Sequence, residues 1–308
     1  MPKFTLRQLE YLIAAADAGA VAGAASGLNV SQPSVSAALR KLEDQLGVQL
    51  LVRHHAQGVT LTPTGQRLIT SARSLLAQAE DWQREAAAAE GEIAGELTIG
   101  SFMTLAPMYL PGLMTDFMLA HPAVTLRIAE GTQGSLIDGL VASRFQLALI
   151  YEADLPIKLD LTLLATLDPH VLLPASHDLA ACTAVKLWQL AGQPMVLLDV
   201  APSRTYFRTL LRAHGIEPTV AFASPSIELV RGLVARGLGY SLLITRPAGD
   251  MSYEGLPLAI RPLADTVEPG RLMLARLPDV RPTRLERTFV TFAVNWFAAR
   301  YPDAPLPP

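Results

Sequence analysis

A helix of small residues followed by a tightly capped helix constrains the fold more than any other part of the chain. Ala20 to Ser26 is small and apolar, which suits a helix that crosses closely over its neighbours, and Gly27 is expected to end it in the left-handed conformation. Ser31 then caps a further helix, with Pro33 in its first turn, where a missing amide costs nothing. With an earlier helix capped by Thr5, the stretch predicts three helices and then a small hairpin.

The helix that begins near Ser31 has two distinct faces. Val35, Leu39, Leu42 and Leu46 recur at helical spacing, which predicts one buried stripe. The opposite face carries Pro33, Ser36, Ala37, Arg40 and Lys41. A helix of this kind enters the DNA major groove with its N-terminal residues against base edges, while hydroxyl and basic groups hold phosphates. The exposed face is therefore the candidate for reading DNA.

Dense motifs occupy the N-terminal part of the chain. They are Ala24-Ala25, Leu28, Val30 to Ser36, Leu42-Glu43, Leu46 to Val48, Leu50, Arg53 and Leu61 to Gly65. This pattern resembles the signature of LysR-type transcriptional regulators. The resemblance implies an α plus α/β chain, with a winged helix-turn-helix at 1–64, a long dimerising linker helix at 65–94 and a two-lobed effector domain, similar to periplasmic binding proteins, at 95–308. From it we expect DNA contacts at Gln32, Pro33, Ser36, Arg40 and the wing residue Arg53, with Ser34, Lys41 and His54 beside them.

The chain departs from the family pattern at several positions. The family usually has a polar cap at Ala20 and a basic residue at Gly23, and often has Arg-Gln where this chain has Ala37-Ala38. Those losses weaken phosphate and base contacts, so no DNA contact is assigned to Ala37. In the wing, His54 and His55 could meet phosphate or the minor groove if protonated; as a second interpretation they are solvated turn residues, since an unperturbed histidine is mostly neutral near pH 7.

The composition limits the class of protein. The net charge is −3, yet residues 1–67 carry six Lys or Arg against four acidic residues, so the electrostatic signal for DNA is local and weak. One cysteine, Cys182, excludes an internal disulfide, and we interpret it as a buried small residue in preference to a sensor thiol. There is no leader and no long apolar run, so we expect a soluble cytoplasmic protein with no membrane partner. The six histidines show no metal-ligand spacing, and no nucleophile elbow or phosphate-binding loop occurs, so we expect no enzyme, metal or cofactor.

An apolar stripe without an obvious cover follows the hairpin. From Gly65 to about Ala94 the chain is rich in helix formers, and Thr62 and Pro63 start the helix. The residues assigned to dimerisation on this stripe are Leu68, Leu75, Leu76, Ala79 and Trp82. A long helix needs tertiary burial to persist, so we expect the stripe to pair two linker helices in a dimer. The alternative is packing against the chain's own effector domain. Gly91 and Gly95 are expected to form a hinge.

After the hinge the pattern alternates between strands and helices. This predicts a parallel sheet whose ligand site lies beyond the carboxyl ends of the strands. The expected segments are strands 97–100, 124–129 and 147–150 with helices 105–120 and 135–143, and then strands 161–167, 171–173, 195–198, 219–223 and 240–243 with helices 203–214 and 227–236. A strand at 272–275 and a helix at 283–300 return the chain to the first lobe. Lobe I is thus expected at about 95–160 and 268–308, and lobe II at about 161–267.

Two crossings between lobes predict a ligand cleft. The residues expected to line it are Ser101, Phe102, Thr104, Gln133, Ser135, Tyr151, Ser203, Arg204 and Ser224. Arg204, at the helix that Ser203 is expected to cap, could hold a carboxylate bidentately, or it could form a salt bridge with Asp199. Phe102 and Tyr151 could set the ligand size or belong to the wall and core.

These expectations describe a ligand-responsive regulator. It would bind a dyad-like promoter site in double-stranded DNA as a homodimer or homotetramer, with RNA polymerase as a further partner. A small-molecule effector, favoured as a carboxylate by the helix N-termini, would shift its conformational populations. Two alternatives stay open. One is a cytoplasmic solute-binding or enzyme-like protein with a helical arm that does not bind DNA, and the other is a regulator that answers to a partner protein or to oxidation of Cys182.

Overall fold

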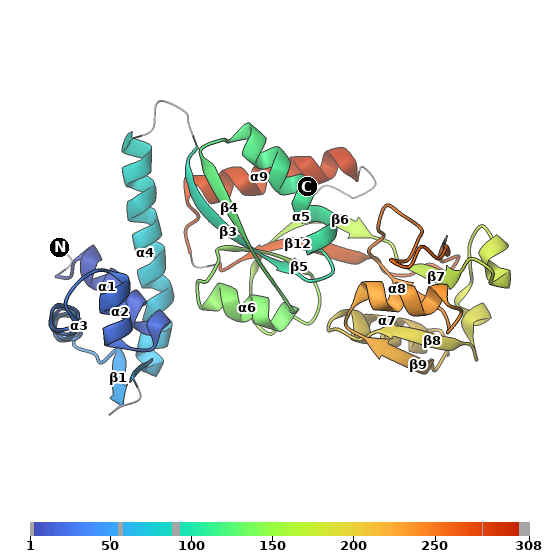
Figure 1. The fold of residues 1–308 in the computed structure, drawn as a ribbon, viewed down its shortest axis with the longest axis horizontal. Helices are drawn as coiled ribbons and strands as arrows, with labels where there is room; N and C mark the ends of the chain where they lie inside the picture. The colour runs from blue at the N-terminus through green and yellow to red at the C-terminus, as the bar shows by residue number, and fades with distance from the viewer. Residues whose placement is uncertain (1–2, 55–57, 88–92, 279, 302–308) are drawn as a thin grey trace. The chain divides into compact units, whose positions relative to one another are not determined.

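The structure is a computed structural model that describes residues 3–54, 58–87, 93–278 and 280–301 of the 308-residue chain. The chain divides into two compact units, one built mainly on residues 1–95 and the other mainly on residues 96–308. Figure 1 shows the helices and strands of both. In the described ranges, no helix combines the length and the hydropathy needed to cross a membrane.

The first unit contains four helices and one hairpin among its described residues. They are α1 (Leu6–Ala18), α2 (Val21–Gly27), α3 (Gln32–Leu46), β1 (Leu51–His54), β2 (Gly58–Leu61) and α4 (Pro63–Ala87). The predicted caps of α1 and α3 are confirmed: Thr5 forms a capping box with Gln8, and the Ser31 hydroxyl accepts a hydrogen bond from the Ser34 amide. The prediction for Gly27 was wrong, because it stays helical and the left-handed residue is Asn29, with φ of 53°.

A single apolar core holds the first unit together. Val35, Leu39 and Leu42 of α3 are buried as predicted and pack with residues of α1 and α2. Leu46 was expected in the same stripe but is exposed. It lies in the last turn of α3, immediately before Gly47, whose left-handed φ of 68° ends the helix.

The start of α4 is fitted closely to the hairpin. The Thr62 hydroxyl accepts a hydrogen bond from the Gly65 amide at 2.9 Å and donates to the Gln49 carbonyl at 2.7 Å, so Thr62 does cap this helix. A Cβ on Gly65 would lie 2.2 Å from the Leu50 carbonyl oxygen. Only glycine allows so close a contact between helix and strand.

A mixed five-stranded sheet forms the centre of the second unit. Its order is β4 (Val124–Gly131), β3 (Gly95–Phe102), β5 (Leu147–Tyr151), β12 (Gly270–Arg276) and β6 (Asp160–Leu167). Helices α5 (Ala106–Ala120) and α9 (Arg284–Arg300) lie on one side in Figure 1 and α6 (Gln133–Val141) on the other. β3 and β5 are parallel as predicted, but β12 is antiparallel to both of its neighbours. The expectation of an all-parallel sheet was therefore wrong at the strand that returns from the far end of the chain.

The strand β6 does not lie where the sequence predicted. It was expected to open lobe II, whereas it pairs with β12 from Asp160 to Leu167 in the five-stranded sheet. The crossing between lobes therefore comes after β6 and not before it. Pairing between strands so far apart in sequence leaves no local pattern that would have shown this.

The remaining elements form two small sheets with helices beside them. They are β7 (His170–Pro174), β8 (Pro194–Leu198), α7 (Ser203–Ala213), β9 (Thr219–Ser224), α8 (Ile227–Ala235), β10 (Ser241–Leu243) and β11 (Leu258–Pro262), with short 3-10 helices at Asp178–Ala181 and Leu187–Leu190. β7 pairs antiparallel with β10 and β11, and β8 pairs parallel with β9. The sequence did not predict β11, which lies between Pro257 and the strand-ending Pro262. We call these elements lobe II, and the five-stranded sheet with α5, α6 and α9 lobe I.

Candidate DNA-binding face and effector cleft

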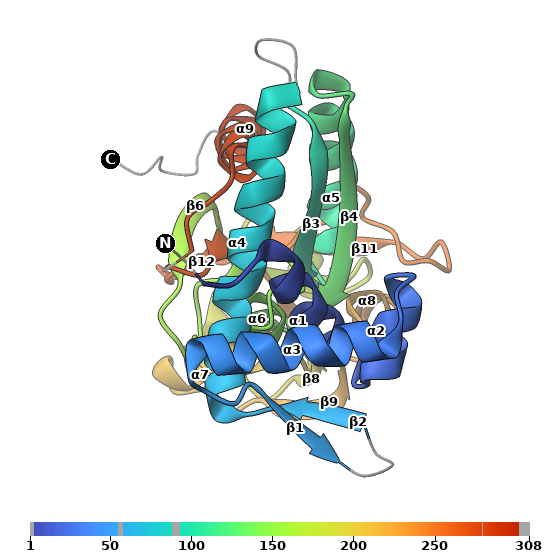
Figure 2. The ribbon, with the colours of Figure 1, turned by 90° about the vertical axis from the view of Figure 1, so that its left-hand side faces the viewer.

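The face of α3 assigned to DNA is open to solvent. Gln32, Pro33, Arg40 and Lys41 are exposed and Ser36 is half-buried. Ser34 is also exposed, but its hydroxyl lies 2.7 Å from that of Ser31 at the helix cap. Figure 2 shows α3 and the β1–β2 hairpin of this unit. The α3 face is accessible as predicted, and contact of these side chains with DNA stays a prediction.

The wing is fixed to the helical part of the unit. The Val59 amide donates to the Gly19 carbonyl at the end of α1 over 2.8 Å. On β1, Arg53 and His54 are both exposed, and His54 Nε2 lies 2.9 Å from Thr60 Oγ1 on the paired strand. His54 is thus held by its neighbour strand, and His55 lies outside the described residues.

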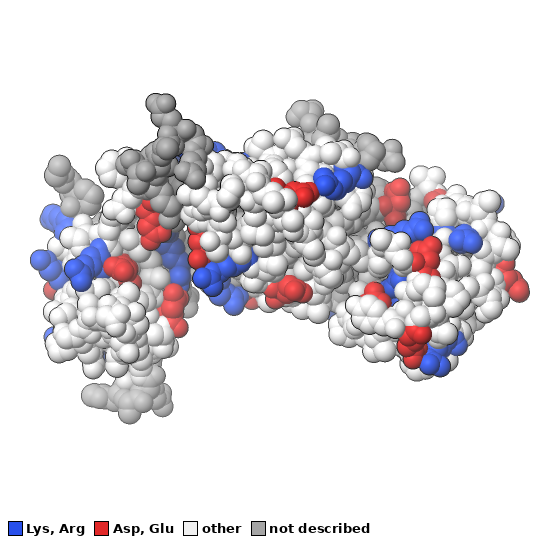
Figure 3. Space-filling view, turned by 45° about the horizontal axis from the view of Figure 1, so that its top comes forward, with Lys and Arg blue, Asp and Glu red and all other residues white. Residues whose placement is uncertain are grey.

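Phosphate binding near α2 has little support from side chains. Ala20, at the N-cap of α2, makes no side-chain cap hydrogen bond. On the face in Figure 3, Lys and Arg residues are interspersed with Asp and Glu residues. This agrees with the weak charge signal of the sequence, since the exposed basic side chains of α3 and β1 are Arg40, Lys41 and Arg53.

The linker stripe divides into two parts. Ala72 is buried in the core of the first unit and Leu76 packs against it, so this part covers the chain's own helices. Neither interpretation of the sequence had included that contact. Ala79 is half-buried, while Leu68 is exposed, as are Leu75 at 44% and Trp82 at 72%. Dimerisation through these exposed side chains stays a prediction.

A cavity of about 390 Å³ opens between the two lobes. Two of the predicted residues, Tyr151 at the end of β5 and Ser203 at the start of α7, line it. The other lining residues are Glu152, Ala153, Pro202, Tyr206, Ile244, Glu268, Pro269, Gly270 and Arg271. We call this cavity the effector cleft. Its volume suits a small molecule and its wall mixes apolar with polar groups.

Several predicted contact residues instead support Tyr151 from behind. Gln133 Oε1 accepts a hydrogen bond from the Tyr151 amide at 3.2 Å, and its Nε2 donates to the Ala153 carbonyl. Thr104 Oγ1 lies 3.4 Å from the Tyr151 hydroxyl. Burial raises the pKa of Tyr151 well above its usual value, so the phenol stays neutral.

Phe102 and Ser101 are also part of this buried support. The Phe102 ring is fully buried and meets the Tyr151 ring edge to face, with centroids 5.4 Å apart. Ser101 is fully buried, with its hydroxyl 3.4 Å from the Phe102 carbonyl. Phe102 is thus core, in agreement with the second interpretation of its role. The rule that favours loop residues at strand ends located the region but not the side chains that face the cavity.

The predicted cap of α7 was wrong. Pro202 occupies the N-cap position without a side-chain hydrogen bond, and Ser203 is the first helical residue and buried. Arg204 forms the predicted alternative, an ion pair with Asp199 at 2.8 Å, and is not among the residues that line the cleft. At the other two predicted positions, Ser135 Oγ donates to the Thr132 carbonyl at 2.9 Å and Ser224 Oγ accepts from the Ser226 amide at 3.1 Å.

Sequence reasoning missed four polar residues of the cleft, which are Glu152, Tyr206, Glu268 and Arg271. Tyr206 donates from its hydroxyl to the Glu268 carbonyl, and burial, with the Glu268 charge adding to it, raises the pKa of Tyr206 to about 12. Arg271 Nη1 pairs with Glu152 Oε2 at 2.7 Å. Glu152 directly follows β5, so the strand-end rule applied one residue further would have found it.

Comparison with known proteins decides the family. The model of the LysR substrate binding domain matches residues 90–298, and the model of the bacterial regulatory helix-turn-helix protein of the lysR family matches residues 6–66. The chain belongs to the LysR family of transcriptional regulators. It therefore has a DNA-binding helix-turn-helix domain followed by an effector-binding domain, as the sequence predicted.

Individual LysR-family relatives are similar to this protein over most of its chain. The DNA-binding transcriptional dual regulator OxyR of Escherichia coli K12 is 31% identical over 77% of this chain and 78% of its own. The structure of HinK, a LysR family regulator from Pseudomonas aeruginosa, is 41% identical with a TM-score of 0.66 and covers 96% of this chain and 99% of HinK. Full-length CbnR in complex with its target DNA is 26% identical, with a TM-score of 0.56 over 96% of this chain and 100% of CbnR.

Proposed function

We propose that this LysR-family regulator binds a dyad-like promoter site as a homodimer or homotetramer and senses a small carboxylate in the effector cleft. The observation that carries the proposal is the cleft of about 390 Å³, because lobe I and lobe II both contribute to its wall. Residues 1–64 would read DNA, the helix after them would pair two chains, and residues 95–308 would bind the effector.

The preference for an anion rests on the start of α7. Pro202 and Ser203 line the cleft, and α7 begins there without a side-chain cap. The positive end of the helix dipole favours a carboxylate at such a point, where the Arg204 amide already donates to the Val200 carbonyl at 2.9 Å. Arg271 lines the cleft together with two acidic side chains, Glu152 and Glu268, so the carboxylate preference does not come from the net charge of the wall. Arg271 pairs with Glu152, and Arg204, in the first turn of α7, pairs with Asp199. An incoming carboxylate can exchange with those partners.

Binding in the cleft can be coupled to DNA through the lobes. Tyr151 and Arg271 belong to lobe I, whereas Ser203 and Tyr206 belong to lobe II. A ligand that contacts both sets binds one lobe arrangement better than the other and shifts the population toward it. We propose that this shift alters half-site spacing or DNA bending, and through it the contact with RNA polymerase.

The DNA proposal rests on the α3 face. Arg40 and Lys41 are exposed on that helix, at the positions that the family resemblance assigns to DNA. The related CbnR has been crystallised on its target DNA, which supports the same use of this domain here. A phosphate or base contact from Arg40 would account for about 1 to 3 kcal/mol of binding.

Footprinting on the intergenic DNA beside the gene tests this half of the proposal. The wild type and Arg40→Ala should be compared across a salt series, with Arg212→Ala, an exposed arginine of lobe II, as the matched control. We expect a protected dyad-like region that weakens steeply with salt, is lost in Arg40→Ala and is kept in Arg212→Ala. No protection at low salt would contradict DNA binding by this face.

Calorimetry with a panel of small carboxylates and their amides tests the other half. A carboxylate that binds the wild type should lose affinity in Ser203→Leu, which places a larger apolar side chain in the cleft wall. It should also bind more tightly than its neutral amide. Equal affinity for acid and amide would remove the anion preference, while leaving the cleft as the site.

A further inference from the structure

A second and larger cavity lies elsewhere in the effector-binding domain. Its volume is about 890 Å³, and it shares only Ile244 with the lining of the effector cleft. Its wall includes the segment from Thr166 to His170, where the chain leaves lobe I for lobe II, and Tyr109 and Tyr301 from lobe I. We call it the His170 cavity. Nothing in the proposed regulator mechanism uses it.

His170 brings an unpartnered acceptor to this cavity. The residue is 7% exposed, and its Nε2 has no hydrogen-bonding partner among the residues that the structure describes. The backbone of Asp168 lies beside the ring and favours its protonated form. Burial nevertheless lowers the pKa of His170 to about 4. A neutral ring with its proton on Nδ1 offers Nε2 as an acceptor.

Glu228 brings a second acceptor. It lines the same cavity from the first turn of α8, and its Oε1 lies 3.2 Å from Nε of Arg231. Its Oε2 is buried and, within the described part of the chain, has no hydrogen-bonding partner. Buried polar atoms are nearly always paired, so two buried, unpartnered acceptors in residues that line one cavity call for a donor that reaches them through a small side-chain movement, either a ligand or an ordered water.

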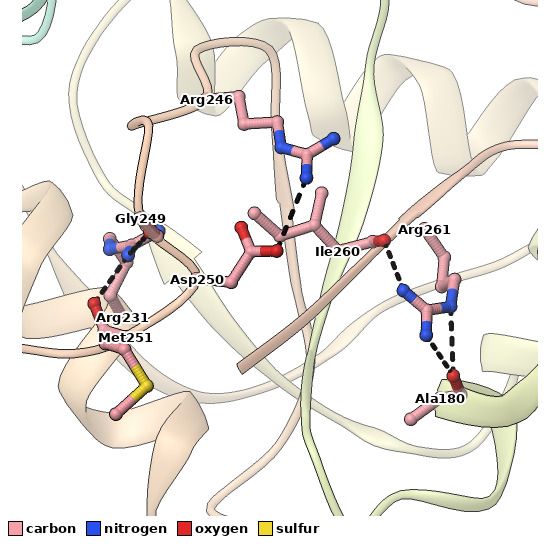
Figure 4. A network of polar contacts seen from close by, with 8 residues as sticks. All are labelled: Ala180, Arg231, Arg246, Gly249, Asp250, Met251, Ile260 and Arg261. Carbon is pink, nitrogen blue, oxygen red and sulfur yellow. Dashed lines mark hydrogen bonds and ion pairs between the residues drawn. The ribbon is translucent and has the colours of Figure 1, made fainter. Parts of the chain in front are cut away.

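The loop at residues 246–251, of which Arg246, Pro247 and Ala248 line the cavity, is held by two arginines. Arg231 is 1% exposed and donates from Nη2 to the carbonyls of Gly249 at 2.8 Å and Met251 at 2.7 Å. Arg246 forms an ion pair with Asp250 at 3.4 Å, and both arginines hold the same loop in Figure 4. The cavity is therefore preformed at this loop, which lowers the entropic cost of binding.

The charges and rings of the wall define the ligand. Asp168, Glu228 and Arg246 are the lining side chains that carry charge when His170 is neutral. Glu228 is paired with Arg231 and Arg246 with Asp250, so the net negative charge that remains at the wall is that of Asp168. Tyr109, Tyr253 and Tyr301 add aromatic faces, which attract cations, and most of the other lining residues are apolar. We infer that the His170 cavity is a second ligand site, which takes a primary amine carried on an apolar or aromatic body.

Such a ligand would act on the same lobes as the effector. The ammonium group donates to His170 Nε2 and to Glu228 Oε2, and the body packs against the rings and apolar residues of both lobes. Because the wall includes the crossing segment at Thr166 to His170, an amine bound there is coupled to the lobe angle. This inference goes beyond the carboxylate proposal and does not depend on it.

Calorimetry on the full-length protein with tyramine as the probe tests the site. Tyramine joins a primary amine to an aromatic ring, and 4-hydroxyphenylacetate is the matched control of opposite charge. We expect saturable tyramine binding that weakens by about tenfold or more in Glu228→Gln, since a charge-assisted hydrogen bond is lost. Glu217→Gln, an exposed acid of lobe II outside the cavity, should leave the affinity unchanged.

Glu228→Gln leaves the buried Arg231 beside a neutral amide and could therefore fail to fold, so a second variant is needed. Ala248→Trp changes an exposed residue of the cavity wall and should block tyramine while keeping the fold. Hydrogen exchange should show tyramine protecting residues 166–170 and 246–251. Ser203→Leu, which alters the effector cleft, should leave tyramine binding intact.

Three results would overturn the inference. One is undiminished affinity in both cavity variants, and another is protection confined to the effector cleft. The third is no binding of tyramine, phenethylamine or butylamine up to about 10 mM, the weak end of measurable affinity. Loss of the carboxylate response with tyramine binding retained would count against the proposed function alone.

Discussion

Nη1 of Arg204 lies 2.8 Å from Oδ1 of Asp199, so the guanidinium expected to hold an effector already has a carboxylate partner. Arg204 is 47% exposed and Asp199 is 35% exposed. A pair so open to solvent contributes little to folding, about 1 kcal/mol at most. Its larger effect is on the charge available to a ligand, because Asp199 neutralises the arginine beside the effector cleft.

Removing that competition should strengthen carboxylate binding. We expect Asp199→Asn to raise the affinity for an anionic effector by about two- to tenfold, since the freed guanidinium can reorient toward the ligand. Arg204→Gln should lower it. Isothermal titration of both variants with one carboxylate measures the change, and unchanged affinity in both would show that Arg204 has no part in the site.

Gly65 should be intolerant of a side chain. Gly65→Ala places a Cβ 2.2 Å from the Leu50 carbonyl oxygen and 3.1 Å from the Leu61 side chain, and the backbone contact cannot relax cheaply. We expect a loss of about 1 to 3 kcal/mol in the stability of the DNA-binding unit. Urea unfolding, monitored through hydrogen exchange in residues 3–54, measures this loss of stability.

Gly27→Ala is the matched control within the same unit. Gly27 is helical and a Cβ there would meet nothing within 4 Å. This substitution should stabilise the unit by about 0.5 to 1 kcal/mol. Equal effects of the two substitutions would show that the close approach of α4 to the Leu50 carbonyl does not contribute to stability.

The exposed side chains of α4 should hold two chains together. Leu75→Glu places a charge on the exposed part of the stripe. We expect it to raise the dissociation constant of the dimer by about tenfold or more relative to the wild type. Sedimentation velocity over a dilution series measures this. Leu119→Glu, at an exposed position of α5, is the control of identical chemistry. If both variants keep the mass of the wild type, the exposed face of α4 is not an interface.

His170 should make the effector-binding domain sensitive to mild acid. Burial lowers its pKa from 6.5 to about 4; Arg246 and Arg231 add to the lowering, whereas the Asp168 backbone and Asp250 oppose it. Well above pH 6.5 the ring is neutral in both the folded and the unfolded chain, so its contribution to the free energy of unfolding is fully present. Between pH 6.5 and 4 mainly the unfolded chain takes up the proton, so the free energy of unfolding decreases as the pH is lowered.

The expected loss from this residue between pH 7 and pH 5 is about 2 kcal/mol. Comparing urea unfolding of the wild type and His170→Gln at the two pH values isolates it, because other groups titrate alike in both proteins. A wild type no more acid-sensitive than the variant would mean that the ring is protonated in the folded state.

The N-terminal unit could be predicted closely because its signals are local. Thr5 with Gln8, Ser31 with Pro33, and Thr62 with Gly65 each fix a helix start within four residues of sequence, and all three were found. Side-chain caps and fixed dihedral angles act over that range. The errors at Gly27 and Leu46 came at helix ends, where tertiary packing decides.

The effector-binding domain could be predicted in its elements but not in its pairing. Alternation of strands and helices located most of them, yet nothing near Asp160 indicates that β6 pairs with β12. The cleft shows the same limit. Ser101, Thr104 and Gln133 lie near strand ends as predicted, but they are buried behind Tyr151, and burial is set by residues distant in sequence.

The two links between the lobes differ in length. Only Asp168 and Pro169 separate β6 from β7, whereas the chain returns from β11 to β12 through the seven residues Leu263 to Pro269. A two-residue link that includes proline has few free dihedral angles and little reach. The lobes therefore cannot separate far at residue 169, and a change in the angle between them must be absorbed close to it. His170 is the next residue, so whatever occupies its cavity lies beside the shorter of the two links.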